Sequence, residues 1–206
     1  MTLDRLISID AETNGLAGRA FAVALTLTDQ RGEIDYAVYR CPIDQPVDTW
    51  VAHNVLPAIG DIAVTCPDYD GLLSSVRDQY TQWMEPGTIV AGHVTWPVEA
   101  RLLLDLLPGQ QVWTGPYPLI DVSSVLLAHG HNPLSVDEYN AAHGILAPPG
   151  SPHHPLYDAR AAERCLRHLL AAGPERRQLI ARMTRDSINL GLYDIPAAEY
   201  PPKETP

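Results

Sequence analysis

The order of extended and helical segments is the feature that most constrains the fold of this chain. Residues 4 to 10, 20 to 28 and 33 to 40 are short apolar segments, and turn signals such as Asn14-Gly15 separate them. Three such segments in succession predict an antiparallel meander of strands, because short turns join neighbouring strands that run in opposite directions.

After the meander, strands and helices are expected to alternate. Residues 88 to 92 and 117 to 121 are predicted strands, and a helical segment follows each of them, at 98 to 107 and at 122 to 129. Further helices are predicted at 47 to 57, from the cap Asp70 to residue 85, and at 134 to 143, 156 to 171 and 174 to 185. The Pro-rich segment 147 to 155 is predicted to be a loop. This order predicts an α/β domain with a mixed central sheet and helices on both of its faces.

The composition is that of an ordinary globular protein. The chain has 206 residues, of which 46% are hydrophobic and 19% are charged, so one domain with a real core is expected. We assign this domain to residues 1 to 185 and a Pro-rich tail to 186 to 206. No signal segment and no membrane span is apparent, which predicts a cytoplasmic protein without membrane contact. The three cysteines lack C-x-x-C spacing, so neither a disulfide framework nor a zinc ribbon is implied.

Two carboxylates end the first predicted strand. In an extended segment Asp10 and Glu12 point to one side, whereas Ile7, Ile9 and Ala11 point to the other. Neighbouring carboxylates repel each other, and a hard divalent cation bound through oxygen ligands relieves the repulsion. The pair therefore suggests a metal site. The alternative is a solvated strand end before a turn.

A second group of candidate residues lies near the last strong helix. In HHPLYDARAAERCLRHLL, Asp158 falls early in the helix and His153 lies five residues before it in a loop. Such a carboxylate can bind a metal, and a loop histidine can act as a mobile general base. The alternatives are a solvated loop imidazole and a helix-start charge that complements the helix dipole.

These two motifs resemble those of the DEDD 3'-5' exonuclease superfamily, in its histidine-bearing subclass. The resemblance covers about residues 5 to 171 and implies the ribonuclease H-like, or DnaQ-like, fold. It implies that Asp10 and Glu12 in SIDAETNGL bind two divalent metal ions, Mg²⁺ or Mn²⁺. It also implies that Asp158 is a metal ligand and that His153 is the general base.

The second motif departs from the family pattern. The family carries an aspartate in a phrase like A-H-N-x-x-F-D-x-x-x-L, and here the corresponding phrase is AGHVTWPVEARLL. Pro97 or Val98 falls at the position of the acid, and neither can bind a metal. We predict that Glu99 replaces the aspartate as a ligand; the alternative is a first-turn helix charge and a site with one ligand fewer. His93 and Trp96 are candidates for lining the substrate cleft, although a packed tryptophan is the simpler account of Trp96.

The resemblance also suggests how a substrate is held. Asn14, Gly15 and Leu16 lie where family members hold the terminal nucleotide through backbone contacts and an apolar wedge. The segments EIDYAVYR and WVAHNVLP resemble the RNase AS type of actinobacterial exoribonuclease. That resemblance implies a homodimer and a preference for RNA.

Three functions are consistent with the sequence. The first is a metal-dependent 3'-5' exonuclease that acts on the 3' end of single-stranded nucleic acid, with RNA favoured over DNA. The second is a weak or inactive member that serves as a nucleic-acid-binding or assembly module, and the third is a phosphodiesterase for short oligonucleotides. The net charge of -11 argues against binding by general electrostatic attraction, but bound metals can contact phosphate.

Overall fold

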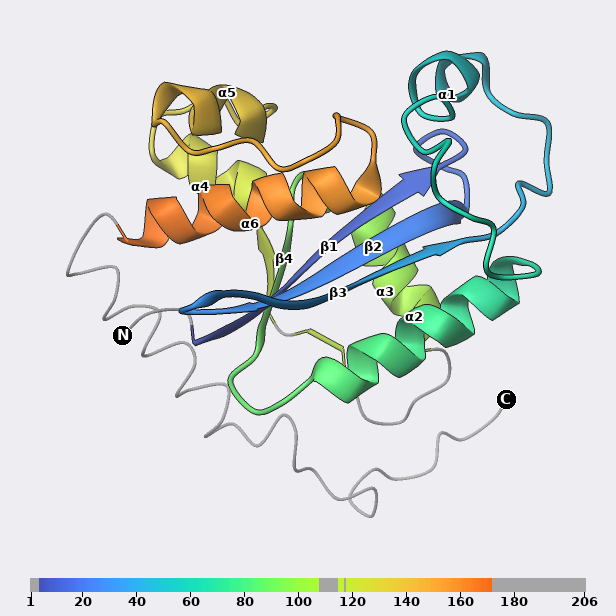
Figure 1. Ribbon diagram of the computed structural model, residues 1–206, viewed down its shortest axis with the longest axis horizontal. Helices are drawn as coiled ribbons and strands as arrows, with labels where there is room; N and C mark the ends of the chain where they lie inside the picture. The colour runs from blue at the N-terminus through green and yellow to red at the C-terminus, as the bar shows by residue number, and fades with distance from the viewer. Residues whose placement is uncertain (1–3, 108–114, 117, 172–206) are drawn as a thin grey trace, which may run out of the picture.

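Five strands form one mixed sheet in the computed structural model, in the order β3-β2-β1-β4-β5 (Figure 1). The structure describes residues 4 to 107, 115 to 116 and 118 to 171. The strands are β1 (Arg5–Thr13), β2 (Ala20–Asp29), β3 (Gly32–Arg40), β4 (Ile89–Gly92) and β5 (Leu119–Asp121). The pairs β1-β2 and β2-β3 are antiparallel, whereas β1-β4 and β4-β5 are parallel. The predicted meander and mixed sheet are therefore confirmed.

Helices cover both faces of this sheet, as the sequence predicts. They are α1 (Thr49–Asn54), α2 (Tyr69–Trp83), α3 (Val98–Leu106), α4 (Val122–Ala128), α5 (Val136–Ala142) and α6 (Pro155–Ala171). One core lies between the sheet and α2 and α3, and a second core lies between the sheet and α4, α5 and α6 (Figure 1). Within the described residues, no helix combines the length and apolar composition needed to span a bilayer.

The two faces of β2 differ in side-chain size, and this difference allows α6 to lie close to the sheet. The large side chains of β2 belong to the core that includes α2 and α3; they are Phe21, Val23, Leu25 and Leu27. The alternate positions carry alanine and threonine, and Arg167 of α6 donates a hydrogen bond to Thr28. The predicted apolar stripe of α6 is buried, namely Ala159, Ala162, Leu166 and Leu169.

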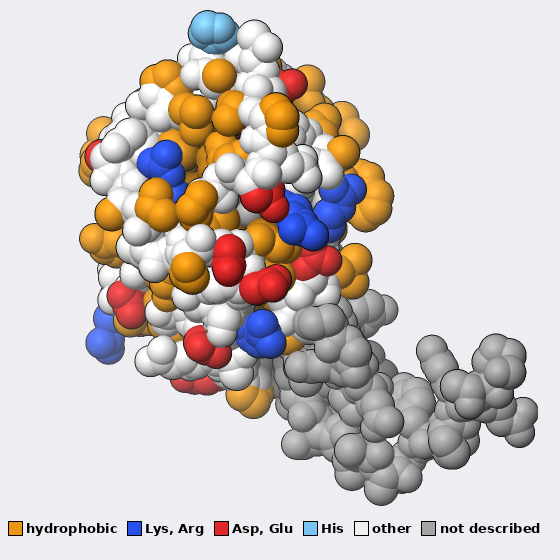
Figure 2. All heavy atoms as spheres, turned by 90° about the vertical axis from the view of Figure 1, so that its right-hand side faces the viewer, with side chains coloured by type: hydrophobic (Ala, Val, Ile, Leu, Met, Phe, Trp, Pro, Cys, Tyr) orange, Lys and Arg blue, Asp and Glu red, His pale blue; other side chains and the backbone are white. Residues whose placement is uncertain are grey.

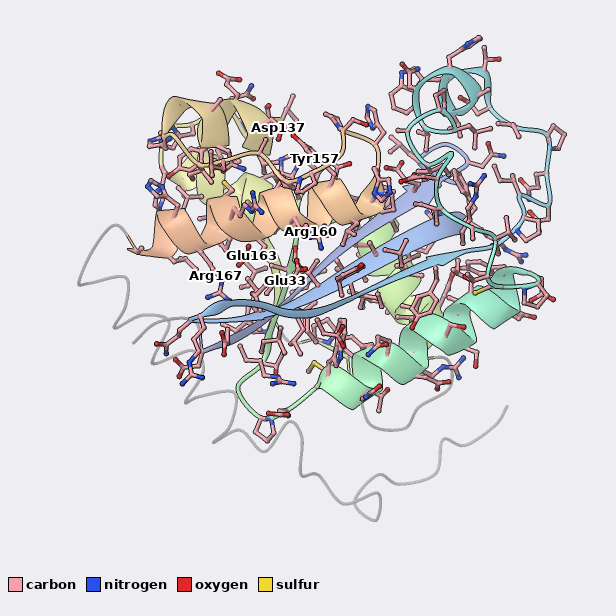
Figure 3. The ribbon with its side chains drawn as sticks, viewed as in Figure 1. Glu33, Asp137, Tyr157, Arg160, Glu163 and Arg167 are labelled. Carbon is pink, nitrogen blue, oxygen red and sulfur yellow. The ribbon has the colours of Figure 1, made fainter. Side chains whose placement is uncertain are left out.

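Ionic contacts tie α6 to the edge of the sheet. Arg160 donates from Nε and Nη2 to the two oxygens of Glu33 on β3, each at 2.7 Å, and its guanidinium lies over the Tyr36 ring. Arg167 pairs with Glu163 one turn before it (Figure 3). Because bidentate arginine pairs have a defined geometry, these contacts help to fix the helix that carries Asp158 relative to the sheet.

Several predicted boundaries differ from those of the structure; β1, for example, extends to Thr13 and not only to residue 10. The N-cap of α2 is Asp68 rather than Asp70, because the Asp68 carboxylate accepts the Gly71 N–H at 2.8 Å. The helix α6 begins at Pro155, inside the predicted loop, since a proline in the first turn lacks only an N–H that has no intrahelical partner. The predicted helix at 174 to 185 and the tail lie outside the described residues. The three cysteines are free and buried.

Candidate active site

The strand β1 presents Asp10 and Glu12 toward the face of the sheet that α6 covers. Their neighbours Ile7 and Ile9 point into the opposite core, as the alternation of side chains along a strand requires. Asp158 lies in the first turn of α6, and His153 lies in the preceding loop. Glu12, His153 and Asp158 each offer one possible ligand atom, and these three atoms all lie within 4.8 Å of one another. The structure therefore brings the two predicted motifs together.

Local contacts hold His153 beside Asp158. The backbone N–H of His153 donates to Asp158 Oδ2 at 2.8 Å, and the backbone N–H of Asp158 donates to the His154 carbonyl at 3.1 Å. His153 has a φ of 65°, a left-handed conformation that is uncommon for residues other than glycine. Its ring lies edge to face with Trp50 of α1, with the centroids 5.2 Å apart. Sequence reasoning assigned no site role to Trp50, because the contact spans distant segments.

Glu99 lies at the edge of the carboxylate cluster and is only 3% exposed. Its Oε1 accepts the backbone N–H of Ala11 at 3.2 Å, between the two acids of β1. A Cβ atom at Gly92 would lie 2.9 Å from the Ile9 carbonyl, so a glycine in β4 permits the close approach of β4 to β1 at this point. The Trp96-Pro97 peptide before α3 is cis. The fold thus brings Glu99 to the other acids, and its role as a metal ligand stays a prediction.

Burial and the charges of neighbouring acids raise the pKa of all four acids. Desolvation is the main cause in each case; it raises the pKa of Glu12 and of Glu99 to about 8 and that of Asp158 to about 7. The pKa of Asp10 is raised well above its ordinary value by burial and then by the charges of Asp158, Glu99 and Glu12. Buried acids of this kind are stabilised by a cation.

The donor set fits a hard divalent metal ion. Carboxylate oxygens are the ligands that Mg²⁺ prefers and that suit Mn²⁺, and they converge here with one imidazole. Asp10, Glu12 and Asp158 are the residues that could hold such an ion, with Glu99 behind them and His153 beside them.

The cluster opens onto a cavity of about 290 Å³. Asp10, Glu12, His153 and Asp158 line one side of it. The other lining residues include His93 and the segment 134 to 137, which contains Asp137 at the start of α5. The His93 Nε2 atom lies 2.9 Å from the Pro133 carbonyl oxygen, so His93 contacts this segment directly. Sequence reasoning missed Asp137. The sequence shows it only as an acid in the first turn of a predicted helix, two residues after Ser135, and that position does not indicate a site.

The remaining predicted substrate residues lie around the site but do not line this cavity. Asn14 bridges two loops, because its amide donates to the Pro46 carbonyl at 3.0 Å and its Oδ1 accepts the Asp48 N–H at 2.8 Å. Gly15 has a φ of 77°, as expected for the predicted turn. Leu16 is 73% exposed, which suits a wedge. Trp96 is 75% exposed, so the packed alternative was wrong.

No protein-family model and no curated protein matches this sequence. Solved structures do. An exonuclease I from Methylocaldum szegediense is 18% identical, with a TM-score of 0.64 over 91% of this chain and 45% of the other. Exonuclease I of E. coli in complex with a dT13 oligonucleotide is 16% identical, with a TM-score of 0.63 over 87% of this chain and 43% of the other.

An exonuclease X in complex with 5' overhanging duplex DNA is 18% identical, with a TM-score of 0.57 over 87% of this chain and 99% of the other. This chain spans less than half of the length of the exonuclease I chains that it matches. The likeness shows a shared fold. The predicted ribonuclease H-like exonuclease fold is therefore confirmed.

Proposed function

We propose that the protein is a metal-dependent 3'-5' exonuclease that hydrolyses single-stranded nucleic acid to 5'-nucleotides. The observation that carries this proposal is the convergence of three partly buried acids on one cavity, with the buried acid Glu99 next to them, in a fold shared with exonucleases I and X. The acids come from three elements, β1, α3 and α6, that are far apart in the sequence. A role in packing alone does not account for such a group, because burial of ionisable acids costs free energy unless a partner compensates.

Each member of the cluster has a role in this proposal. Asp10, Glu12, Glu99 and Asp158 hold two divalent cations, Mg²⁺ or Mn²⁺. When bound, such cations stabilise the charge on a reacting phosphate and activate a water molecule. His153 accepts the proton of the attacking water, and its place beside Asp158 at the cavity supports this role.

The substrate is a single strand with a 3' end. Two structures with this fold hold DNA: an exonuclease I with dT13 and an exonuclease X with an overhanging duplex. The RNase AS-like segments of the sequence favour RNA, and they also suggest a homodimer. On the face that Figure 2 shows, the described Lys and Arg side chains are scattered among acidic and apolar ones. Together with the net charge of -11, this face favours a strand that is held by the metals and a few local contacts over one that is held by a broad basic surface.

A second candidate is a binding or assembly module without catalysis. It is favoured by one observation: Glu99 accepts a backbone N–H and does not line the cavity, so the site would have one ligand fewer.

Labelled RNA and DNA oligomers of graded length separate these possibilities. We expect stepwise shortening from the 3' end with Mg²⁺ or Mn²⁺, no shortening with chelator, and loss of shortening in Asp10→Ala. Asp70→Ala is the matched control, because Asp70 is an exposed acid in the first turn of α2. Tight binding without shortening under any metal would support the module instead. Shortening of only the shortest oligomers would indicate a phosphodiesterase for short substrates.

A further inference from the structure

Asp137 lies in the wall of the cavity, and the proposed reaction does not use it. It occupies the first turn of α5, and it lines the cavity together with Leu134, Ser135 and Val136. The same cavity is lined by Asp10, Glu12, His153 and Asp158, so a substrate held at the cluster lies within the space that Asp137 borders.

The Asp137 carboxylate is held in place by a buried tyrosine. The Tyr157 hydroxyl donates to Asp137 Oδ1 at 3.0 Å, and Tyr157 is only 6% exposed (Figure 3). The helix start is also fixed, because Ser135 Oγ accepts the Glu138 N–H at 3.1 Å. This side chain is therefore held by its own network, as residues that recognise a ligand commonly are.

A carboxylate at this place does not suit a phosphate, because the two charges repel each other. The proposed ions are already assigned to Asp10, Glu12, Glu99 and Asp158, so Asp137 is left without a metal-binding role in this scheme. Its Oδ1 atom accepts the Tyr157 hydroxyl, and its carboxylate borders the cavity. A carboxylate that faces a substrate cavity under these conditions is best satisfied by a neutral hydrogen-bond donor of the substrate.

The neutral donors of a nucleic-acid strand are the sugar hydroxyls and the amino and imino groups of the bases. The sugar is bonded directly to the phosphate, and the base extends farther away. A phosphate at the cluster therefore places the sugar, before the base, inside the cavity that Asp137 borders. The 2'-hydroxyl is the sugar donor that distinguishes RNA from DNA.

We propose that Asp137 accepts a hydrogen bond from the ribose 2'-hydroxyl of the nucleotide at the cluster, and so selects RNA over DNA. This inference rests on the proposed nuclease function and deepens it. Asp137 is a specificity-determining residue in this scheme, and Tyr157 is the positioning residue that aims its carboxylate.

The test compares oligoribonucleotides with the same oligomers that carry one 2'-deoxy or 2'-fluoro nucleotide, at the terminal or at the penultimate position. Neither replacement can donate a hydrogen bond. We expect the kcat/KM of the wild type for the all-ribo substrate to be about tenfold higher than its kcat/KM for at least one of the substituted oligomers. This is the difference expected for the loss of one hydrogen bond to a charged group. In Asp137→Ala this ratio should fall to near one, through a loss on the all-ribo substrate alone.

Two further variants complete the comparison. Asp137→Asn keeps an acceptor oxygen and the shape of the side chain, so it should keep part of the preference and should fold even if the alanine variant does not. Glu138→Gln removes an exposed negative charge from the same helix turn, outside the cavity lining, and keeps an oxygen that can accept the Asn132 amide, so it should leave the ratio unchanged. A wild type without any preference, or an Asp137→Ala variant with an unchanged ratio, would overturn the inference. An equal loss on all substrates would also overturn it, because it would indicate a general structural role.

Failure of the nuclease function would be recognised separately. If the wild type shortened no oligomer, equilibrium binding by fluorescence anisotropy would replace the rates. The same tenfold ribo-to-deoxy ratio, reduced in Asp137→Ala, would still support the inference, and equal binding of both sugars would refute it.

Discussion

Replacement of Glu99 by glutamine is predicted to stabilise the metal-free protein at neutral pH. Burial raises the pKa of Glu99 from an ordinary value of 4.5 to about 8, and the charges of Asp121 and Asp158 act in the same direction. An acid whose pKa is higher in the folded than in the unfolded state contributes stability at pH values below its unfolded-state pKa. This contribution is lost as the pH rises from the unfolded-state pKa through the folded-state pKa. Glutamine has no such loss, and its amide oxygen can still accept the Ala11 N–H.

The size of the effect follows from the two pKa values. Between pH 4.5 and pH 7 the loss for Glu99 amounts to at most roughly 3 kcal/mol, at about 1.4 kcal/mol per pH unit. For a chain of this length, that free energy corresponds to a rise in Tm of at most about 6 to 12 °C in Glu99→Gln at neutral pH. Near pH 4.5 the wild type and the variant should differ little in stability. At that pH Glu99 is protonated in nearly all folded molecules and in about half of the unfolded ones, so little of the loss has occurred.

Urea unfolding in the presence of chelator, at about pH 5 and about pH 7, measures this difference. Asp70→Asn is the control, since this acid is exposed and should show no pH-dependent gain. Addition of Mn²⁺ should then raise the Tm of the wild type more than that of Glu99→Gln, because a ligand that binds only the folded state adds stability that increases with the logarithm of its affinity. If the variant were destabilised equally at both pH values, Glu99 would be a simple packing residue and the reasoning would be refuted.

Two further predictions concern the cluster and the core. The affinity for Mn²⁺, measured by calorimetry, should rise between about pH 6 and about pH 8. The pKa of Asp158 is about 7 and that of Glu12 is about 8, and metal binding requires the ionised form of both acids. An affinity that does not change with pH would contradict the raised pKa values. Leu166→Ala should lower the free energy of unfolding by roughly 2 to 5 kcal/mol in urea titrations, since Leu166 is fully buried between α6 and the sheet. A loss much below 1 kcal/mol would show that the core can collapse around the site.

The sequence predicted the strands and helices well because the patterns involved are local. The alternation in β2 correctly assigned large residues to one face and small ones to the other. The same alternation placed Asp10 and Glu12 on one side of β1. Where the predictions failed, as at the cap Asp68 and at the helix start Pro155, the choice depended on which side chain or backbone group finds a hydrogen-bond partner.

The site itself was only partly predictable. His153 and Asp158 were found because they are five residues apart and resemble a known motif. Asp137 and Trp50 were missed, because each reaches the site from an element that is distant in the sequence and carries no motif of its own. For Trp96 the alternative of a packed tryptophan was wrong, since exposure depends on what surrounds a side chain and not on its own polarity.

The sequence by itself determined the periodicities, and these fix which residues share a face of a strand or a helix. It therefore determined the layered α/β architecture and the pairing of Asp10 with Glu12. Only the tertiary structure decided that Glu99 reaches the backbone of Ala11, and that Asp137 lines the same cavity as Asp10, Glu12 and Asp158. The physical reason is that burial, electrostatic repulsion and hydrogen bonding act between atoms that lie close in space, and the chain brings such atoms together only when it folds.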